Sequence, residues 1–199
     1  MKNKEQFNPQ YHQTPDQLHF IDTVSDVEHS NKTDEQEERY YKTTPETNAC
    51  KQVFEDLSDR GYKLFHLTTT YLENYEWTSR PKDINLYFRN FYNKSFAPYI
   101  LQEPVTEENK YDVPVCYSFI DEHPIRSHSK GYPVLHHHSV IAVKPEFALR
   151  THCLIGTNTV KSMSKKFMST YMTSAIPSVV TYAAKMFRKY PEFELFGYR

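Results

Sequence analysis

The chain has few cysteines and no long apolar run, and these absences exclude several protein classes. Its three cysteines, Cys50, Cys116 and Cys153, form neither a CxxC pair nor the framework of a disulfide-rich domain. No segment approaches the roughly 18 consecutive apolar residues of a membrane-spanning helix. The N-terminal region has no basic segment followed by an apolar core, so we expect no signal peptide. The simplest expectation is a reduced, cytoplasmic protein with no membrane partner.

The chain also lacks a strong net charge, but its charges are unevenly distributed. The formal net charge of the 199 residues is −1 at pH 7. Residues 1–43 carry nine acids and five Lys or Arg, whereas residues 144–199 carry nine Lys or Arg and three acids. The C-terminal part is therefore basic, as in proteins that bind nucleic acid. The length allows one domain plus a tail, and is too short for an additional helicase domain of ordinary size.

The polar composition of residues 1–43 predicts a disordered N-terminal tail. Residues 44–199 are predicted to form the folded domain, and aromatic residues, 15% of the chain, favour a real core. Thr44 and Pro45 predict the start of a helix that ends at Gly61. An amphipathic helix is expected from Asp83 to Tyr99, and helical segments are expected from Pro145 onward.

Three consecutive histidines within an apolar segment form the most informative feature of the chain. This segment, at about 133–143, is predicted to be a strand, in which alternate side chains share a face. His136 and His138 would then point the same way and His137 the other way. Two such imidazoles are half of a divalent-metal site, which needs a carboxylate, another imidazole or water to complete it. The alternative is a solvent-exposed run of histidines without metal.

A second motif is Tyr182-Ala183-Ala184-Lys185, in a segment that is predicted to be helical. Five residues at helical spacing would face the core: Ile176, Val180, Ala183, Phe187 and Tyr190. Tyr182, Lys185 and Lys189 would lie on another face. A tyrosine beside two lysines is a candidate nucleophile for a polyanion, because ammonium groups favour the phenolate and bind phosphate. The alternative is a boundary tyrosine with solvated lysines.

A third motif lies upstream, in Lys63–Tyr71, which is rich in β-branched and aromatic residues and is predicted to be a strand. It contains Leu67-Thr68-Thr69-Thr70, a Leu-Thr-x-Thr pattern. A strand with this pattern, a strand with paired histidines and a helix with Tyr-x-x-Lys follow in this order. The ordered set resembles the HUH endonuclease superfamily, and most closely the rolling-circle replication initiators of phages and plasmids. The resemblance covers approximately residues 60 to 190.

The resemblance implies roles for individual residues. His136 and His138 match the two metal-binding histidines of the superfamily. Tyr182 matches the nucleophile that attacks a DNA phosphodiester, becomes linked to the 5′ phosphate and releases a free 3′ hydroxyl. Lys185 matches the lysine one turn later.

Two positions add detail to this resemblance. His137 stands where the superfamily usually has a large hydrophobic residue. Some relatives have a second tyrosine four residues after the first, and here that position is Met186, which implies an enzyme with one tyrosine. Four basic residues of the C-terminal part are expected to contact DNA: Lys165, Lys166, Arg188 and Lys189.

The third metal ligand in such proteins often comes from the strand beside the histidine strand. A strand is predicted at about 113–121, and Asp121 and Glu122 stand at its end. A register slip of one residue exchanges the faces, so both acids remain candidates, with Glu122 preferred. Alternatively, both acids simply end the strand in a turn before Pro124. The resemblance implies Mg²⁺ or Mn²⁺, and imidazole ligands suit Mn²⁺ better.

This order of elements predicts an α+β fold, an antiparallel sheet with helices packed on one face. The resemblance implies a ferredoxin-like sheet, as in RNA-recognition domains, whose open face carries the histidines and receives single-stranded DNA. We therefore expect a metal-dependent, tyrosine-based DNA nicking and joining enzyme that initiates rolling-circle replication. Its expected partners are single-stranded DNA at an origin and a separate, host helicase and polymerase.

Two alternative functions remain at the level of sequence. A transposase or mobilisation relaxase would use the same chemistry in another biological setting. A non-catalytic domain that binds single-stranded nucleic acid could use the same sheet, and Tyr182 would then be only structural.

Overall fold

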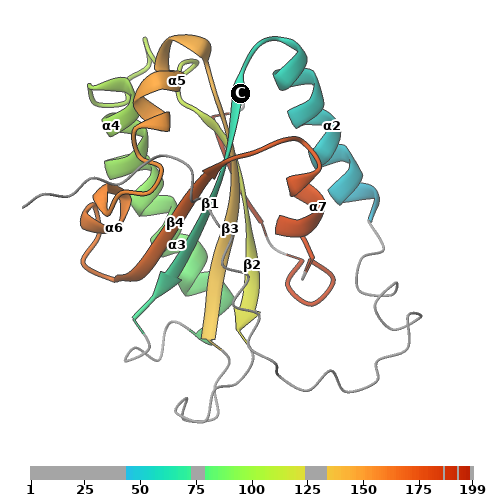
Figure 1. Ribbon diagram of the computed structural model, residues 1–199. Helices are drawn as coiled ribbons and strands as arrows, with labels where there is room; N and C mark the ends of the chain where they lie inside the picture. The colour runs from blue at the N-terminus through green and yellow to red at the C-terminus, as the bar shows by residue number, and fades with distance from the viewer. Residues whose placement is uncertain (1–43, 73–78, 124–133, 186, 192, 198–199) are drawn as a thin grey trace, which may run out of the picture. The chain divides into compact units, whose positions relative to one another are not determined.

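The computed structural model describes residues 44–72, 79–123, 134–185, 187–191 and 193–197 (Figure 1). The tail predicted at residues 1–43 lies outside these residues, as does Met186. The helices are α2 (Pro45–Asp59), α3 (Pro81–Phe91), the π-helical η2 (Tyr92–Phe96), α4 (Ala97–Leu101), α5 (Pro145–His152), α6 (Thr159–Ser162) and α7 (Val179–Ala183). The strands are β1 (Lys63–Tyr71), β2 (Val115–His123), β3 (Val134–Val143), β4 (Phe167–Ser174) and β5 (Phe193–Phe196).

The five strands form one antiparallel sheet in the order β4-β1-β3-β2-β5. The α+β class and the antiparallel, ferredoxin-like sheet predicted from sequence are confirmed. The histidine strand β3 is the middle strand, between β1 and β2. The backbone of β3 is therefore hydrogen-bonded to a strand on each side, which fixes the positions of its side chains.

The prediction of helices on one face and an open face with the histidines is wrong, because helices pack on both faces of the sheet (Figure 1). On one face, Leu67 of β1 and Ile141 of β3 belong to a large core with the aromatic residues of α3 and η2. On the other face, α2 and α7 pack on Leu64, Val140 and Ala142. We call this second face the histidine face, because it also carries His66, Thr68, His136 and His138. On the histidine face, α2 and α7 thus cover the end of the sheet that carries Val140.

The N-terminal elements follow their sequence signals closely. Thr44 caps α2, and its Oγ1 accepts a hydrogen bond from the Thr47 amide at 3.2 Å. After α2, Gly61 adopts a φ of +89°, which suits glycine and turns the chain into β1. The predicted amphipathic helix is confirmed as the consecutive elements α3, η2 and α4, whose buried residues include Phe88 and Phe96.

The expectation of only helical segments after Pro145 is wrong, because β4 and β5 are strands at the two edges of the sheet. In β4, Phe167 and Met172 are buried on the same side although they are five residues apart. The register shifts between Thr70 and Tyr71 of β1, so that Met168 has no partner in the ladder. This irregularity removes the strict alternation that identifies a strand in a sequence.

The predicted C-terminal helix is also shorter than its periodicity suggests. Only Val179–Ala183 is helical, and turns follow it. Val180 and Ala183 are buried as expected, but Ile176 is 68% exposed. Among the described residues, no helix has the length and apolar character needed to span a membrane.

Candidate metal centre

The pairing of β3 with its neighbours decides which side chains meet on the histidine face. Opposite residues of an antiparallel pair lie on the same face. His136 pairs with Thr70 of β1 and Asp121 of β2, and His138 pairs with Thr68 of β1. The predicted alternation is therefore confirmed: His136 and His138 share a face, and His137 points to the opposite one.

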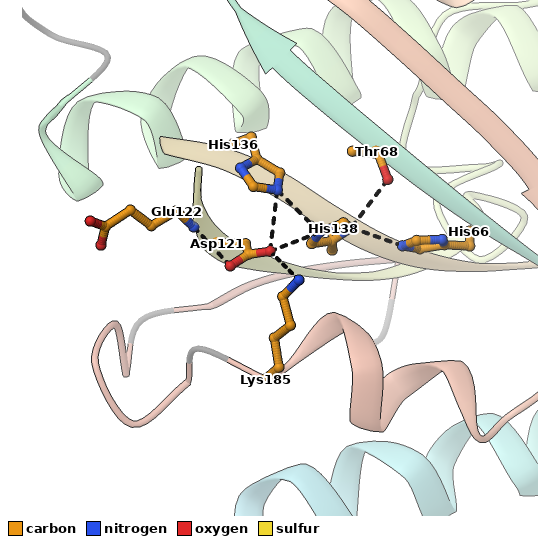
Figure 2. Close-up of polar contacts among 7 residues, drawn as sticks. All are labelled: His66, Thr68, Asp121, Glu122, His136, His138 and Lys185. Carbon is orange, nitrogen blue, oxygen red and sulfur yellow. Dashed lines mark hydrogen bonds and ion pairs between the residues drawn. The ribbon is translucent and has the colours of Figure 1, made fainter. Parts of the chain in front are cut away.

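Three potential ligand atoms form a compact triangle on this face (Figure 2). Nε2 of His138 and Nε2 of His136 lie 3.0 and 3.2 Å from Oδ2 of Asp121. The two Nε2 atoms lie 3.1 Å apart. All three residues are buried.

This donor set fits a divalent cation in chemistry and in spacing. Two imidazoles and one carboxylate are common ligands of first-row divalent metals. Three ligands on one face of an octahedron, with bonds of about 2.1 Å, lie about 3 Å apart. The spacing of the triangle matches this value, so the buried group of Asp121, His136 and His138 could hold a metal ion.

The structure corrects the preference for Glu122 as the third ligand. Successive strand residues face opposite sides, and Asp121 turns toward the histidines while the Glu122 carboxylate points away from them (Figure 2). Oε2 of Glu122 accepts hydrogen bonds from Lys189 and, at 2.7 Å, from the Tyr190 hydroxyl. Burial opposes ionisation of Glu122, but these hydrogen bonds lower the pKa of its carboxyl below the usual value.

Lys185 contributes a positive charge beside the triangle. Its Nζ lies 2.7 Å from Oδ2 of Asp121, the oxygen that also faces both histidines. Burial alone would raise the pKa of Asp121, but hydrogen bonds from His136, His138 and Lys185 hold it far below the usual value. Burial alone would lower the pKa of Lys185, but its hydrogen bond to Asp121 raises it. Asp121 is therefore a carboxylate at neutral pH and Lys185 an ammonium.

Tyr182 lies against the same group, as its position in the motif predicts. Its ring centroid is 5.1 Å from that of His138, in an edge arrangement, and Nζ of Lys185 lies 4.6 Å from the Tyr182 ring. The side chain is 45% exposed. Tyr182 and the two histidines thus converge, although some forty residues separate them in the sequence.

One pocket of about 370 Å³ collects these side chains. It is lined by Thr68, Asp121, Glu122, His136, His138, Tyr171, Tyr182 and Lys185. Tyr171, on the edge strand β4, pairs with Thr68 and is 65% exposed. An exposed aromatic ring beside the pocket gives the site a stacking surface that the sequence did not reveal, because β4 was not expected to be a strand.

The four basic residues expected to contact DNA lie outside the pocket lining, as far as the chain is described. Lys165 and Lys166 are exposed just before β4, and Nζ of Lys166 lies 4.8 Å from the Tyr87 ring. Arg188 is exposed in the turns after α7, and Lys189 is paired with Glu122. The structure thus brings Lys185 into the site and Lys189 to Glu122 at its edge, and it does not bring Lys165, Lys166 or Arg188 into the pocket.

His66 is a site residue that the sequence analysis did not single out. It lies on β1, and its Nε2 is 3.1 Å from Nδ1 of His138, with the two rings stacked at 5.2 Å. Oγ1 of Thr68 is also 3.1 Å from the same Nδ1 (Figure 2). Burial, with smaller effects of His138 and Lys185, lowers the pKa of His66 to about 4. The signal was present in the sequence as alternate residues, His66 and Thr68, on the strand beside β3.

His137 belongs to the core on the far side of the sheet. It is completely buried, with Nδ1 at 2.6 Å from the Tyr71 hydroxyl and Nε2 at 2.8 Å from Oδ1 of Asn85. Burial first, and then His136 and His138, lower its pKa to about 3, so the ring is neutral. Because Asn85 Oδ1 only accepts, Nε2 of His137 donates to it and Nδ1 accepts from Tyr71. His137 therefore occupies a core position, and both of its ring nitrogens have hydrogen-bond partners.

Comparisons with known proteins give no relative for this chain: no family model, no curated protein and no solved structure matches it.

Proposed function

We propose that this chain is a metal-dependent, tyrosine-based enzyme that nicks and rejoins single-stranded DNA. The observation that carries the proposal is the convergence of Tyr182, Lys185 and the buried group of Asp121, His136 and His138 in one pocket. A nucleophile, a positive charge and a set of metal ligands are the parts that phosphodiester transfer requires. Their order along the chain is that of the HUH superfamily.

Asp121, His136 and His138 would hold the cation, Mg²⁺ or Mn²⁺. When bound there, a divalent cation would polarise the scissile phosphate and stabilise negative charge in the transition state. The two imidazoles favour Mn²⁺ over Mg²⁺.

Tyr182 supplies the attacking oxygen. A new bond forms between its phenolic oxygen and phosphorus, and the bond between phosphorus and the 3′ oxygen breaks. The phenol proton passes to solvent, and the departing 3′ oxygen takes up a proton. The DNA then carries a 5′ phosphotyrosine linkage and a free 3′ hydroxyl. Because one phosphate ester replaces another, the 3′ hydroxyl can reverse the reaction and rejoin the strand.

Lys185 assists this step electrostatically. Its ammonium lies 4.6 Å from the Tyr182 ring, where it can stabilise the negative charge that develops during the attack on phosphorus. The same charge attracts the phosphate of a bound strand. Loss of the Lys185 charge should therefore slow the reaction, whereas loss of the Tyr182 hydroxyl should abolish it.

Two features support a single strand of DNA as substrate. Tyr171, Tyr182 and the pocket between them are accessible, and exposed rings can stack on unpaired bases. Arg188 is exposed three residues after Lys185 and adds positive charge to the segment that follows α7. The expected setting is a replication origin, with a separate helicase and polymerase; a transposase or mobilisation relaxase would use the same residues.

The decisive experiment detects the covalent intermediate. The full chain is incubated with Mn²⁺ and a labelled pool of single-stranded oligonucleotides, and adducts that survive denaturation are counted. Wild type should form an adduct through the 5′ phosphate, and Tyr182→Phe should form none while it still binds DNA. Tyr171→Phe is the matched control, since it removes a hydroxyl from the same pocket, and it should keep the adduct.

An adduct that persists in Tyr182→Phe would move the nucleophile to another residue. Binding of DNA by wild type without any adduct, across varied strands, would favour the non-catalytic single-strand binder instead.

A further inference from the structure

His66 is a buried imidazole to which the proposed reaction assigns no role. Only 8% of its surface is exposed. It nevertheless contacts both His138 and Tyr182. Its Nε2 lies 3.1 Å from Nδ1 of His138, and its ring meets the Tyr182 ring edge-on at 5.8 Å.

We propose that His66 is a positioning residue that holds His138 in the one tautomer able to bind a metal ion. The proposal rests on the metal site of the proposed function and not on its DNA chemistry.

The tautomer of His138 decides whether it is a ligand. A neutral imidazole has one nitrogen with a hydrogen and one with a lone pair. Nε2 of His138 is the nitrogen that faces Asp121 and His136, so metal binding requires the lone pair on Nε2 and the hydrogen on Nδ1. The hydrogen on Nδ1 then needs an acceptor, because the ring is buried.

Asp121 and His66 favour opposite tautomers. Oδ2 of Asp121, 3.0 Å from Nε2 of His138, accepts a hydrogen from Nε2 and so favours the form that cannot bind metal. Nε2 of a neutral His66 with its hydrogen on Nδ1 accepts from Nδ1 of His138 and favours the binding form. Outer partners of this kind orient the ligating ring and raise metal affinity.

Thr68 shares this task but does not replace His66. Its Oγ1 is also 3.1 Å from Nδ1 of His138, so one N–H has two acceptors within reach. A hydroxyl can rotate and donate as well as accept, so it also tolerates a His138 whose Nδ1 carries the lone pair. Of the two partners, only His66 also stacks on the ring of His138, with the ring centroids 5.2 Å apart, and thereby limits its rotation.

The test measures the affinity of the full-length chain for Mn²⁺ without DNA, by electron paramagnetic resonance of the free ion. His66→Phe keeps a stacked ring but removes the acceptor, and it should bind Mn²⁺ about tenfold more weakly or worse. His66→Gln places an amide oxygen near the position of Nε2 and should recover most of the affinity. His152→Phe, at an exposed histidine at the end of α5, should bind as wild type.

A second measurement reads the tautomer directly. In the metal-free chain, the ¹⁵N shifts of the His138 imidazole should show a larger share of the Nδ1–H tautomer in wild type than in His66→Phe, in which Asp121 alone holds the hydrogen on Nε2. Wild-type affinity together with an unchanged tautomer in a folded His66→Phe chain would overturn the proposal. If His66→Phe does not fold, equal Mn²⁺ affinities of His66→Gln and His66→Leu would overturn it. Failure of the DNA reaction with these Mn²⁺ results intact would count against the proposed function alone.

Discussion

Nζ of Lys185 lies 2.7 Å from Oδ2 of Asp121, the same carboxylate oxygen that Nε2 of His138 approaches to 3.0 Å. The second oxygen of Asp121 already accepts a hydrogen bond from the Glu122 amide at 2.8 Å. A divalent cation at the histidines and the Lys185 ammonium would therefore share one oxygen. Their positive charges repel, which sets metal affinity against the electrostatic help that Lys185 gives to Tyr182.

Replacing Lys185 by methionine should consequently strengthen Mn²⁺ binding while it slows adduct formation. Like charges about 4 Å apart near a protein surface repel by more than the 1.4 kcal/mol that corresponds to a factor of ten, so we expect a gain of about tenfold. Titration of free Mn²⁺ measures the affinity. Lys189→Met, which removes the partner of Glu122, is the control and should leave Mn²⁺ binding unchanged. Weaker binding in Lys185→Met would contradict the shared-oxygen argument.

Of the two neighbouring acids, only Asp121 should be required for metal binding. Asp121→Asn removes the charge of a buried ligand and should weaken Mn²⁺ binding by about a hundredfold and abolish the adduct, as should alanine at His136 or His138. Glu122→Gln should bind Mn²⁺ nearly as wild type. Isothermal titration of each variant gives the comparison, and a Glu122→Gln variant as defective as Asp121→Asn would return Glu122 to the ligand set.

His137→Ala should damage the fold and spare the metal site. The substitution leaves a cavity in the core and removes the partner of the Tyr71 hydroxyl and of the Asn85 oxygen. The free energy of unfolding should fall by about 2 to 4 kcal/mol. Urea titration measures this loss, and the variant that remains folded should bind Mn²⁺ within a few-fold of wild type. Unchanged stability would mean that the Tyr71 and Asn85 contacts contribute nothing.

A chain that begins at Thr43 should fold and keep its Mn²⁺ affinity. The buried residues of both described core clusters lie between Cys50 and Phe196, and the cap of α2 is Thr44. Circular dichroism and thermal unfolding of the shortened chain test this expectation. A large drop in melting temperature would show that residues 1–43 contribute to the stability of the folded part.

The parts of the fold that follow local rules were predictable from the sequence. The cap and glycine around α2 and the β-branched run of β1 each gave the correct element. The alternation on β3 correctly placed His137 on the opposite face from His136 and His138. Each of these signals lies within one element, where the periodicity of side chains is strict.

The parts that depend on contacts between elements were not predictable. Which of Asp121 and Glu122 faces the histidines depends on the register between β2 and β3, and periodicity within β2 leaves it open. The bulge at Met168 conceals β4, and with it the position of Tyr171. His66 became visible as a site residue only once β1 paired with β3. In each case the sequence contains the residue but does not show which residues of the neighbouring strand lie beside it.

The position of β3 in the middle of the sheet implies that the histidines of the pocket and Tyr182 of α7 become exposed on different timescales. The amides of His136 and His138 lie in the middle strand, so deuterium exchange there requires β3 to separate from a neighbouring strand, which disrupts the centre of the sheet. Tyr182 lies at the end of a helix of five residues and is 45% exposed, so its backbone can open locally. The histidines should therefore be among the slower-exchanging of the described positions and Tyr182 among the faster ones, so Tyr182 can leave and re-enter the pocket while the strands beneath it stay paired.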